Sequence, residues 1–220
     1  MPKENRISTK WPTFFGEFYN PEHLKMKNDL ISFFTDYKKN NSGRSSGENY
    51  KLFESKYNLH ENSNPAFKKL LYNFIAKGFL TMSNKANEVQ LKELKKAELA
   101  VTIVDSWFIH YEEGGFVLPH AHSGCSWCCV YYVQLGEDAN LTNGATYFQK
   151  PIPTRATPDF GSIYNKHRLA SFKPEEGKMI IWPHYLMHGS YPYTGEKNRI
   201  VVSANAKVSL VESGKILKSF

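Results

Sequence analysis

The hydrophobic residues in the first part of the chain recur with the period of an α-helix. Asn20-Pro21-Glu22 has the composition of a helix start, because Asn caps free N–H groups and Pro fits the first turn. The apolar face that follows comprises Leu24, Leu30, Ile31, Phe34 and Tyr37. Asn64-Pro65 repeats the start signal, and the second face comprises Phe67, Leu70, Leu71, Phe74, Ile75 and Phe79. We predict two amphipathic helices, the second ending near Met82, that pack on the outside of a sheet.

From about Glu98 the hydrophobic pattern changes to alternation, the period of a β-strand. The alternating positions are Leu99, Val101, Ile103, Asp105, Trp107 and Ile109. Short apolar runs separated by turn clusters follow without long helices, which is typical of an antiparallel sandwich or barrel. Residues 1–19 also allow a short edge strand. We therefore predict an α+β chain that forms one structural domain, with a helical support region at 1–98 and a β core at 99–220.

Histidine residues give the β core a candidate metal site. His120 and His122 lie two positions apart in an extended segment, so both side chains face the same side of a strand. A third imidazole comes much later, and by spacing alone either His184 or His188 can supply it. Three neutral nitrogen ligands suit Fe, Zn, Cu or Ni rather than Mg or Ca. The spacing leaves open whether these residues bind a metal or are hydrogen-bonded core histidines.

Arg199 opens a strand whose one face is formed by Arg199, Val201, Ser203 and Asn205. An Arg that faces the inside of a barrel is costly unless it is paired, and its planar guanidinium suits a carboxylate. A carboxylate cosubstrate is the natural partner if no protein acid is present; the alternative is a surface Arg at a strand start. Nearby, Tyr131 and Tyr132 face opposite sides of their strand, so one phenol can enter the cavity.

Composition and charge narrow the function classes. The 41% hydrophobic and 15% aromatic content indicates a globular chain. The net charge of +7 raises nucleic acid as a partner, but the Lys residues are scattered and no basic helix is present, which argues against a dedicated nucleic-acid role. No apolar stretch is long enough for a membrane span, and the N-terminus lacks an apolar signal core. We expect a cytoplasmic protein with reduced thiols at Cys125, Cys128 and Cys129.

Several short motifs follow one another in a specific order: Trp107, His120-Ala121-His122, Cys128-Cys129-Val130-Tyr131-Tyr132-Val133, His188 and Arg199-Ile200-Val201-Val202-Ser203-Ala204-Asn205. In this order the segment 106–206 resembles the 2-oxoglutarate- and Fe(II)-dependent oxygenases, and most of all a group of such oxygenases from bacteria and phages. It is also similar to the prolyl-hydroxylase branch, through Tyr131-Tyr132-Val133, Asn143-Gly144 and Pro174-Glu175-Glu176-Gly177-Lys178. The resemblance covers a little under half of the chain.

The resemblance implies a double-stranded β-helix, a jelly-roll or cupin-like barrel with N-terminal helices packed on one sheet. It implies a dioxygenase, a hydroxylase, that uses Fe(II), 2-oxoglutarate and O2. His120 and His188 match the iron-binding histidines of the family, which favours His188 over His184. Arg199 matches the residue that pairs with the far carboxylate of 2-oxoglutarate. The further cosubstrate contacts that we predict are Tyr132, Ser203 and Asn205.

The chain departs from the family pattern at the position of the acidic iron ligand, which holds His122. Either the iron has three histidine ligands, or His122 lies outside the ligand set; we predict the first, with His120, His122 and His188 as ligands. A three-His site loses one negative charge and is expected to hold iron less tightly. Val201 also replaces the Ser or Thr that the family places beside the Arg, which removes one hydroxyl contact to the cosubstrate.

Two other functions stay open at this point. One is a three-His cupin-type metal dioxygenase that does not use 2-oxoglutarate, and the other is a catalytically inactive barrel that acts as a binding module. We expect a small-molecule or peptide substrate, whose identity the sequence does not give, and we leave a homodimer open. The candidate substrate or lid residues are Trp107, Tyr111, His167 and Arg168, the last two within the segment 155–168.

Overall fold

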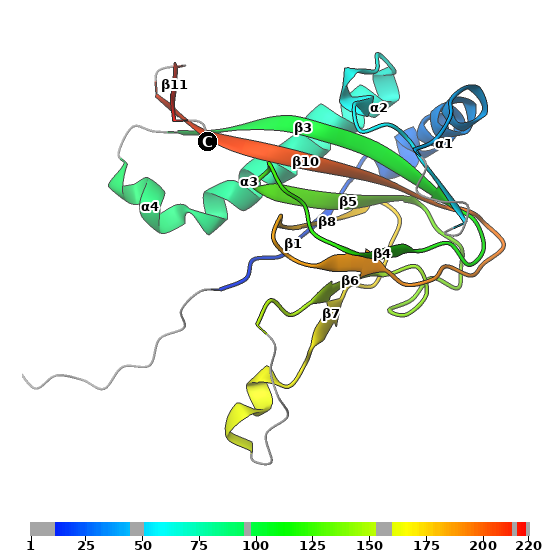
Figure 1. The fold of residues 1–220 in the computed structure, drawn as a ribbon. Coiled ribbons are helices and arrows are strands. Elements are labelled where there is room, and N and C mark those ends of the chain that lie inside the picture. The colour runs from blue at the N-terminus through cyan, green and yellow to red at the C-terminus, as the bar shows by residue number, and fades with distance from the viewer. Residues whose placement is uncertain (1–11, 45–50, 95–97, 153–159, 213–214, 219–220) are drawn as a thin grey trace, which may run out of the picture.

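Two antiparallel sheets face each other, and helices cover the outer face of the larger one (Figure 1). The computed structural model describes residues 12–44, 51–94, 98–152, 160–212 and 215–218. In spatial order, the larger sheet contains β1 (Gly16–Tyr19), β8 (Lys178–Pro183), β5 (Trp127–Gln134), β10 (Arg199–Glu212), β3 (Glu98–Tyr111) and β2 (Leu52–Glu54), and β11 (Lys215–Lys218) pairs with β10. The smaller sheet contains β4 (Val117–His120), β9 (His188–Ser190), β6 (Thr146–Gln149) and β7 (Leu169–Ser171). This is the predicted α+β architecture, a double-stranded β-helix with helices on one sheet.

The helices precede the β core in the chain. They are α1 (His23–Asn40), α2 (Pro65–Leu70), a π-helical turn (Leu71–Ile75), α3 (Ala76–Ala86) and α4 (Glu88–Glu93), with a short 3-10 turn at Leu59–Glu61. A second 3-10 turn, Phe160–Asn165, lies later, between β6 and β7. Both predicted helices are therefore present, and the second continues to Ala86 instead of ending near Met82. Asn64 caps α2 as predicted, because its Oδ1 accepts the Phe67 N–H at 3.0 Å.

The start of α1 differs from the prediction in two details. The helix begins at His23, and Asn20 Oδ1 accepts the Glu22 N–H at 3.0 Å in the turn before it. Leu24, which we placed on the buried face, is 83% exposed, whereas Met26 is buried. The buried face therefore starts from His23 and runs through Met26, because the helix begins later than the Asn-Pro signal suggests.

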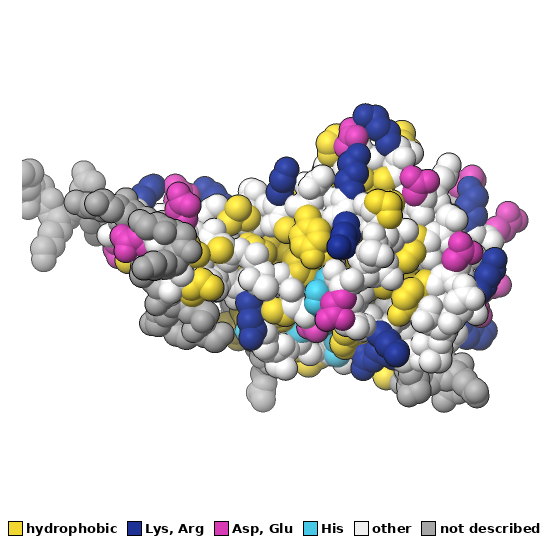
Figure 2. Space-filling view, turned by 90° about the horizontal axis from the view of Figure 1, so that it is seen from above, with side chains coloured by type: hydrophobic (Ala, Val, Ile, Leu, Met, Phe, Trp, Pro, Cys, Tyr) yellow, Lys and Arg dark blue, Asp and Glu magenta, His cyan; other side chains and the backbone are white. Residues whose placement is uncertain are grey.

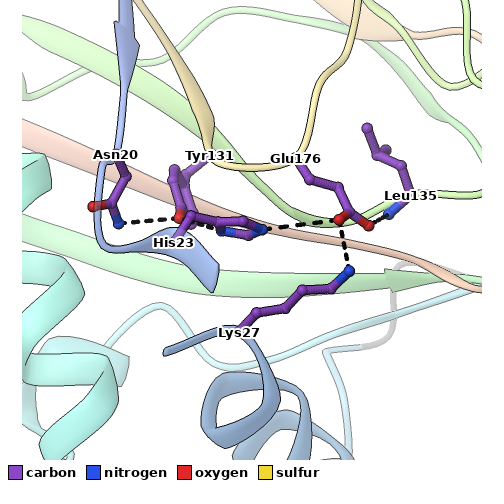
Figure 3. A network of polar contacts seen from close by, with 6 residues as sticks. All are labelled: Asn20, His23, Lys27, Tyr131, Leu135 and Glu176. Atoms are coloured by element: carbon purple, nitrogen blue, oxygen red, sulfur yellow. Dashed lines mark hydrogen bonds and ion pairs between the residues drawn. The ribbon is translucent and has the colours of Figure 1, made fainter. Parts of the chain in front are cut away.

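A polar network fixes the start of α1 against the sheet (Figure 3). Asn20 Nδ2 donates to the Tyr131 hydroxyl at 3.1 Å, and His23 Nδ1 lies 2.7 Å from the same oxygen. Glu176 accepts from Lys27 Nζ at 2.6 Å and lies 3.9 Å from His23 Nε2. Tyr131 therefore faces the helices, as expected of two neighbouring tyrosines on opposite faces of β5.

A β-bulge in β3 changes which residues face the cavity. Asn205 of β10 pairs with Asp105, but the next residue, Ala206, pairs with Ile103, so Val104 has no partner across the ladder. Ile103 packs with the helices, whereas Trp107 packs between the two sheets. The alternation from residue 99 to 109 correctly predicted a strand, but its apolar positions do not share one face. The register shift is what places Trp107 on the face of β3 that packs between the two sheets.

The helical support region also contributes two strands to the larger sheet. The predicted edge strand is β1, which pairs with β8, and β2 pairs with the end of β3. The segment between β2 and α2 crosses the end of the cavity, where the Ser106 N–H donates to the Tyr57 carbonyl at 2.7 Å. The division at residue 98 stays a prediction, since strands from both sides of it share one sheet.

Candidate metal centre

Three imidazole rings converge on the cavity between the two sheets. His120 ends β4 and is the register partner of His188, the first residue of β9, while His122 lies just beyond β4. The ring centroids are 4.3 Å apart for His120 and His188, 5.0 Å for His122 and His188, and 5.1 Å for His120 and His122. One nitrogen of each ring lies within 4.8 Å of those of the other two, a spacing that lets one cation bind all three.

Hydrogen bonds fix which nitrogen of each ring is free. His120 Nδ1 lies 2.9 Å from the Leu118 carbonyl, and His188 Nδ1 lies 2.8 Å from the Leu186 carbonyl. His122 Nδ1 lies 2.8 Å from Asn205 Oδ1. An oxygen of this kind only accepts, so each Nδ1 carries the proton and each Nε2 keeps its lone pair. Three orientated lone pairs are the donor set that a transition metal requires.

The orientation of the Asn205 amide is itself determined by a second contact. Its Nδ2 donates to Asp105 Oδ2 at 3.0 Å, so its Oδ1 must face His122. Asn205 is buried, and Asp105 lies on the neighbouring strand as its register partner. We had predicted that Asn205 contacts the cosubstrate; the structure places its amide against His122 instead, and that assignment to the cosubstrate has no contact to support it.

Burial favours the neutral form of two of these imidazoles, those of His188 and His122. It lowers the pKa of His188 to about 3, with a smaller contribution from His120, and it lowers the pKa of His122 below its ordinary value. Neutral imidazole is the form that binds a metal. His184, the alternative third ligand, lies beside this group: its Nδ1 is 3.1 Å from the His122 carbonyl. The structure thus brings His188, and not His184, into the cluster.

Arg199 lies in the same cavity without a compensating acid. It is 1% exposed, and among the described residues its Nε and Nη1 atoms have no hydrogen-bond partner. Its guanidinium lies over the Tyr111 ring at 4.1 Å and 5.6 Å from the Tyr132 ring centroid. In the described part of the chain no carboxylate forms an ion pair with it. A buried unpaired guanidinium is costly, and a bound anion would offset that cost.

The other predicted cosubstrate residues lie near Arg199. The Tyr132 hydroxyl is 3.1 Å from Thr146 Oγ1, and Thr146 lines the cavity. Ser203 and Val201 also line the cavity, on the same face of β10 as Arg199. Val201 therefore presents methyl groups where the family has a hydroxyl, as the sequence indicated.

The four candidate substrate or lid residues separate into two pairs. Trp107 lines the cavity and stacks on His122, with ring centroids 5.8 Å apart, and Tyr111 lies under Arg199. These positions make them walls of the site. His167 and Arg168 are exposed, and neither is among the described residues that line the cavity. Residues 155–159 of the predicted lid lie outside the described residues, so the lid stays a prediction.

Comparison with known families and structures agrees with this geometry. Residues 105–205 match the model of the family described as "Putative 2OG-Fe(II) oxygenase". The segment that carries the three histidines and Arg199 is thus similar to the 2OG-Fe(II) oxygenase family. The matched segment includes all three converging histidines and Arg199. A comparison with curated proteins found no match.

Solved structures of 2-oxoglutarate oxygenases share the fold of this chain. A prolyl-4-hydroxylase from Pseudomonas putida matches with a TM-score of 0.57 and 9% identity, over 88% of this chain and 91% of that one. A prolyl hydroxylase from Trichoplax adhaerens, in complex with a hypoxia-inducible-factor peptide fragment, matches with a TM-score of 0.57 and 9% identity, over 88% of this chain and 83% of that one. HygX from Streptomyces hygroscopicus, with nickel and 2-oxoglutarate bound, matches with a TM-score of 0.59 and 11% identity, over 89% of this chain and 82% of that one. These likenesses establish the double-stranded β-helix.

Some residues that line the cavity between the two sheets were not predicted from the sequence. Tyr57 and Glu54 line it from the segment that we had left unassigned, and Tyr57 packs on Trp107 with ring centroids 4.6 Å apart. Thr146 lines it from β6, directly after the Asn143-Gly144 turn. No periodic signal marks a three-residue strand such as β2, so only its pairing with β3 reveals these positions.

Surface charge and the helices agree with the expected partner classes. On the face shown in Figure 2, Lys and Arg side chains are interspersed with Asp and Glu and do not gather in one patch. None of the helices in the described part of the chain is both long enough and apolar enough to span a membrane. The absence of nucleic acid as a partner stays a prediction.

Proposed function

We propose that this chain is an Fe(II)- and 2-oxoglutarate-dependent oxygenase, with hydroxylation as its outcome. The observation that carries the proposal is the buried, unpaired guanidinium of Arg199 in the same cavity as three converging imidazoles. A metal site alone does not require this cation, and a structural Arg would have an acid beside it. A ligand that has one end for a metal and a carboxylate at its other end satisfies both features.

His120, His122 and His188 would hold the iron. Their Nδ1 atoms are bound to oxygen acceptors, which orients each ring before the metal arrives. Because all three ligands are neutral, the protein does not cancel any of the metal's charge at the ligand positions. The keto-acid end of 2-oxoglutarate is an anionic ligand, so it fits a site that lacks its own carboxylate.

Arg199 would hold the far carboxylate of 2-oxoglutarate. Its Nε and Nη1 atoms have no partner among the described residues, so their N–H groups are free to donate charge-assisted hydrogen bonds to a carboxylate. The Tyr111 ring at 4.1 Å restrains the guanidinium plane, and the Tyr132 and Thr146 hydroxyls are close enough together to act on one anion. Burial makes this pairing strong, because little water competes for the guanidinium.

When bound, iron and 2-oxoglutarate would supply the oxidising chemistry with O2, and 2-oxoglutarate would leave as succinate and CO2. The chain's own contribution is to orient the ligands, bind the carboxylate and exclude water. Trp107 and Trp182 provide apolar walls beside the histidines, with Trp182 4.7 Å from His188 between ring centroids. The substrate would enter where Tyr57 and Glu54 line the cavity. A small molecule or a peptide remains the proposed substrate class.

The test is turnover of 2-oxoglutarate together with ligand binding. Purified protein with Fe(II) should convert 2-oxoglutarate to succinate in air, slowly without substrate. Under anaerobic conditions the same mixture should give a weak visible charge-transfer band. His188→Ala should abolish both signals, and Arg199→Gln should abolish the band while retaining metal binding, with circular dichroism as the check on folding. A band that survives unchanged in Arg199→Gln would contradict the proposal.

One observation favours a second function. The three-nitrogen ligand set is also that of cupin-type dioxygenases, which do not use 2-oxoglutarate. That function predicts O2 consumption with iron alone and a substrate, and no succinate. It leaves Arg199 without a partner, which is why we rank it second. An inactive binding module would show neither succinate nor O2 consumption.

A further inference from the structure

Two of the cysteines form a close pair beside the metal centre. Cys125 Sγ and Cys128 Sγ are 3.7 Å apart and share a hydrogen bond, while all three cysteines are free thiols. Cys125 lies in the turn before β5, and Cys128 lies within β5. We propose that Cys125 and Cys128 are a redox-active dithiol, a modification site whose oxidant is a small-molecule disulfide such as oxidised glutathione.

The sulfurs can reach bonding distance without moving a strand. A disulfide needs its sulfurs about 2.05 Å apart, so the gap to close is short. Cys125 follows Gly124, which has a φ of 72° and no atom within 4 Å of where a Cβ would lie. The turn therefore has room on one side, and Cys125 can rotate toward Cys128 while β5 keeps its pairing.

The two thiols differ in the way that a dithiol exchange requires. Cys125 is partly exposed and lines an open surface groove with Trp127 and Tyr185, whereas Cys128 is fully buried. Cys125 is thus the attacking thiolate that an oxidant can reach, and Cys128 is the resolving thiol.

The exchange balances without any other reactant. The Cys125 thiolate attacks oxidised glutathione, the glutathione S–S bond breaks, and one glutathione thiolate leaves. The Cys128 thiol then gives up its proton to the departing group and attacks the Cys125 sulfur, which releases the second glutathione. Two protein thiols are oxidised to one disulfide, and one glutathione disulfide is reduced to two thiols.

The pair lies against His122. One nitrogen of His122 and the two sulfurs all lie within 4.8 Å of one another. That group could be taken for a second metal site, but His122 has no nitrogen to spare: Nδ1 is bonded to Asn205 and Nε2 faces the other histidines. Two thiols without a third ligand favour disulfide chemistry. Closing the disulfide pulls the turn that carries His122, so it should weaken the metal centre.

The experiment uses the full metal-free chain, so it does not depend on the oxygenase function. Reduced protein is equilibrated with mixtures of reduced and oxidised glutathione, alkylated, and weighed intact. We expect the thiols of Cys125 and Cys128 to be lost together, so that both escape alkylation. The oxidised chain should be lighter than the reduced chain by two hydrogen atoms before alkylation, and a peptide cross-link should join Cys125 to Cys128. Cys129, which is buried on the opposite face of β5, should stay alkylatable after denaturation.

Three variants make the result decisive. Cys128→Ala should accumulate a mixed glutathione disulfide at Cys125, Cys125→Ser should form no disulfide, and Cys129→Ala should behave as the wild type. Oxidised protein should bind Co(II) roughly tenfold more weakly than reduced protein, the scale of a lost contact behind a ligand. Thiols that persist in excess oxidised glutathione, or a cross-link to Cys129, would overturn the proposal. So would a Co(II)–thiolate charge-transfer band in reduced protein that Cys125→Ser removes.

Discussion

His122 and Asn205 are joined by a hydrogen bond of 2.8 Å between Nδ1 and Oδ1. The amide of Asn205 in turn donates to Asp105 at 3.0 Å, so a carboxylate lies two hydrogen bonds away from the candidate metal. The family places an acidic ligand where this chain has His122. We infer that Asp105, acting through Asn205, makes His122 a better donor and partly offsets the missing negative charge.

This arrangement predicts how metal affinity depends on Asp105. Asp105→Asn should weaken Ni(II) binding roughly tenfold, because it removes the charge that orients the amide. The exchange variant, Asp105→Asn with Asn205→Asp, places the carboxylate directly on His122 Nδ1 and should bind Ni(II) at least as tightly as the wild type. Calorimetric titration of the metal-free protein measures both affinities.

An exposed acid serves as the control for that pair of variants. Asp36 lies on α1, far along the chain from β3, and its side chain is 66% exposed. Asp36→Asn removes the same charge without touching the chain of hydrogen bonds. Equal losses of Ni(II) affinity in Asp36→Asn and Asp105→Asn would show that net charge, and not the contact with Asn205, sets the affinity.

Tyr131 and Tyr132 allow a test in which neighbouring residues should have different effects. The Tyr132 hydroxyl bonds to Thr146 near Arg199, so Tyr132→Phe should weaken 2-oxoglutarate binding about threefold to tenfold, the net value of one ordinary hydrogen bond. The Tyr131 hydroxyl bonds to Asn20 and His23 on the helix side. Tyr131→Phe should instead lower the free energy of unfolding by about 1–2 kcal/mol and leave 2-oxoglutarate affinity unchanged.

Equilibrium urea unfolding and the 2-oxoglutarate dependence of the anaerobic band measure the two effects. Each variant is the control for the other, because both remove one buried phenol oxygen from adjacent positions of β5. A loss of 2-oxoglutarate affinity in Tyr131→Phe as large as in Tyr132→Phe would mean that the strand, and not the hydroxyl, sets the affinity.

Much of this fold follows from local patterns. The Asn64-Pro65 signal predicted a capped helix, and the cap is present because Asn64 accepts the Phe67 N–H. Alternation predicted β3, but it could not place the bulge at Val104, because a bulge depends on the register of two strands and leaves no mark in one. The three histidines could be proposed from spacing and the resemblance favoured His188 over His184, while the pairing of β4 with β9 shows how His188 comes to lie beside His120.

The contacts that the site residues make were harder to predict from the sequence than their positions on the strands. Asn205 was assigned to the cosubstrate by its place on the Arg199 face; the structure shows its amide bonded to His122 and Asp105, and the cosubstrate contact stays a prediction. The bulge turns Asp105 toward Asn205, and this long-range pairing decides what the amide does. We expected Cys125 and Cys128 only to be reduced thiols, and their contact was not predicted, because it depends on the conformation of the turn at Gly124, where φ is positive.

Gly144 links a backbone position to the proposed carboxylate site. It has a φ of 69°, and a Cβ there would lie 2.9 Å from Tyr193 Cδ2 and 3.2 Å from Arg199 Cδ. Gly144→Ala should therefore cost about 1–2 kcal/mol of stability from the backbone alone and also displace Arg199. We expect 2-oxoglutarate affinity to fall while Ni(II) affinity is retained.

Gly124→Ala separates the backbone strain of Gly144→Ala from its displacement of Arg199. Gly124 has a similar φ of 72°, but no atom lies within 4 Å of where its Cβ would be. It should show the backbone cost without any loss of 2-oxoglutarate affinity. If Gly144→Ala binds 2-oxoglutarate like the wild type, Arg199 is not held by this turn.

His23 and His110 predict the pH dependence of stability. Burial lowers the pKa of His110 to about 4, helped by Lys38 and opposed by Glu112, and burial also lowers the pKa of His23 despite the nearby Glu176 (Figure 3). Above about pH 6.5 both rings are neutral in the folded and unfolded chains. As the pH falls below that value, the unfolded chain takes up protons that the folded chain does not, so stability is lost between about pH 6.5 and 4.

Asparagine at position 23 or 110 keeps a hydrogen-bond acceptor close to where the histidine Nδ1 lies, and it removes the group that takes up a proton. His110→Asn and His23→Asn should each flatten the fall in unfolding free energy between pH 7.5 and 4.5, His110→Asn by on the order of 1–3 kcal/mol. The measurement is the urea midpoint and slope at each pH, in metal-free protein with a chelator. His167→Asn, at an exposed position, should leave the pH profile of the wild type unchanged. If His110→Asn keeps the full wild-type slope, burial of that ring is not what makes the protein acid-sensitive.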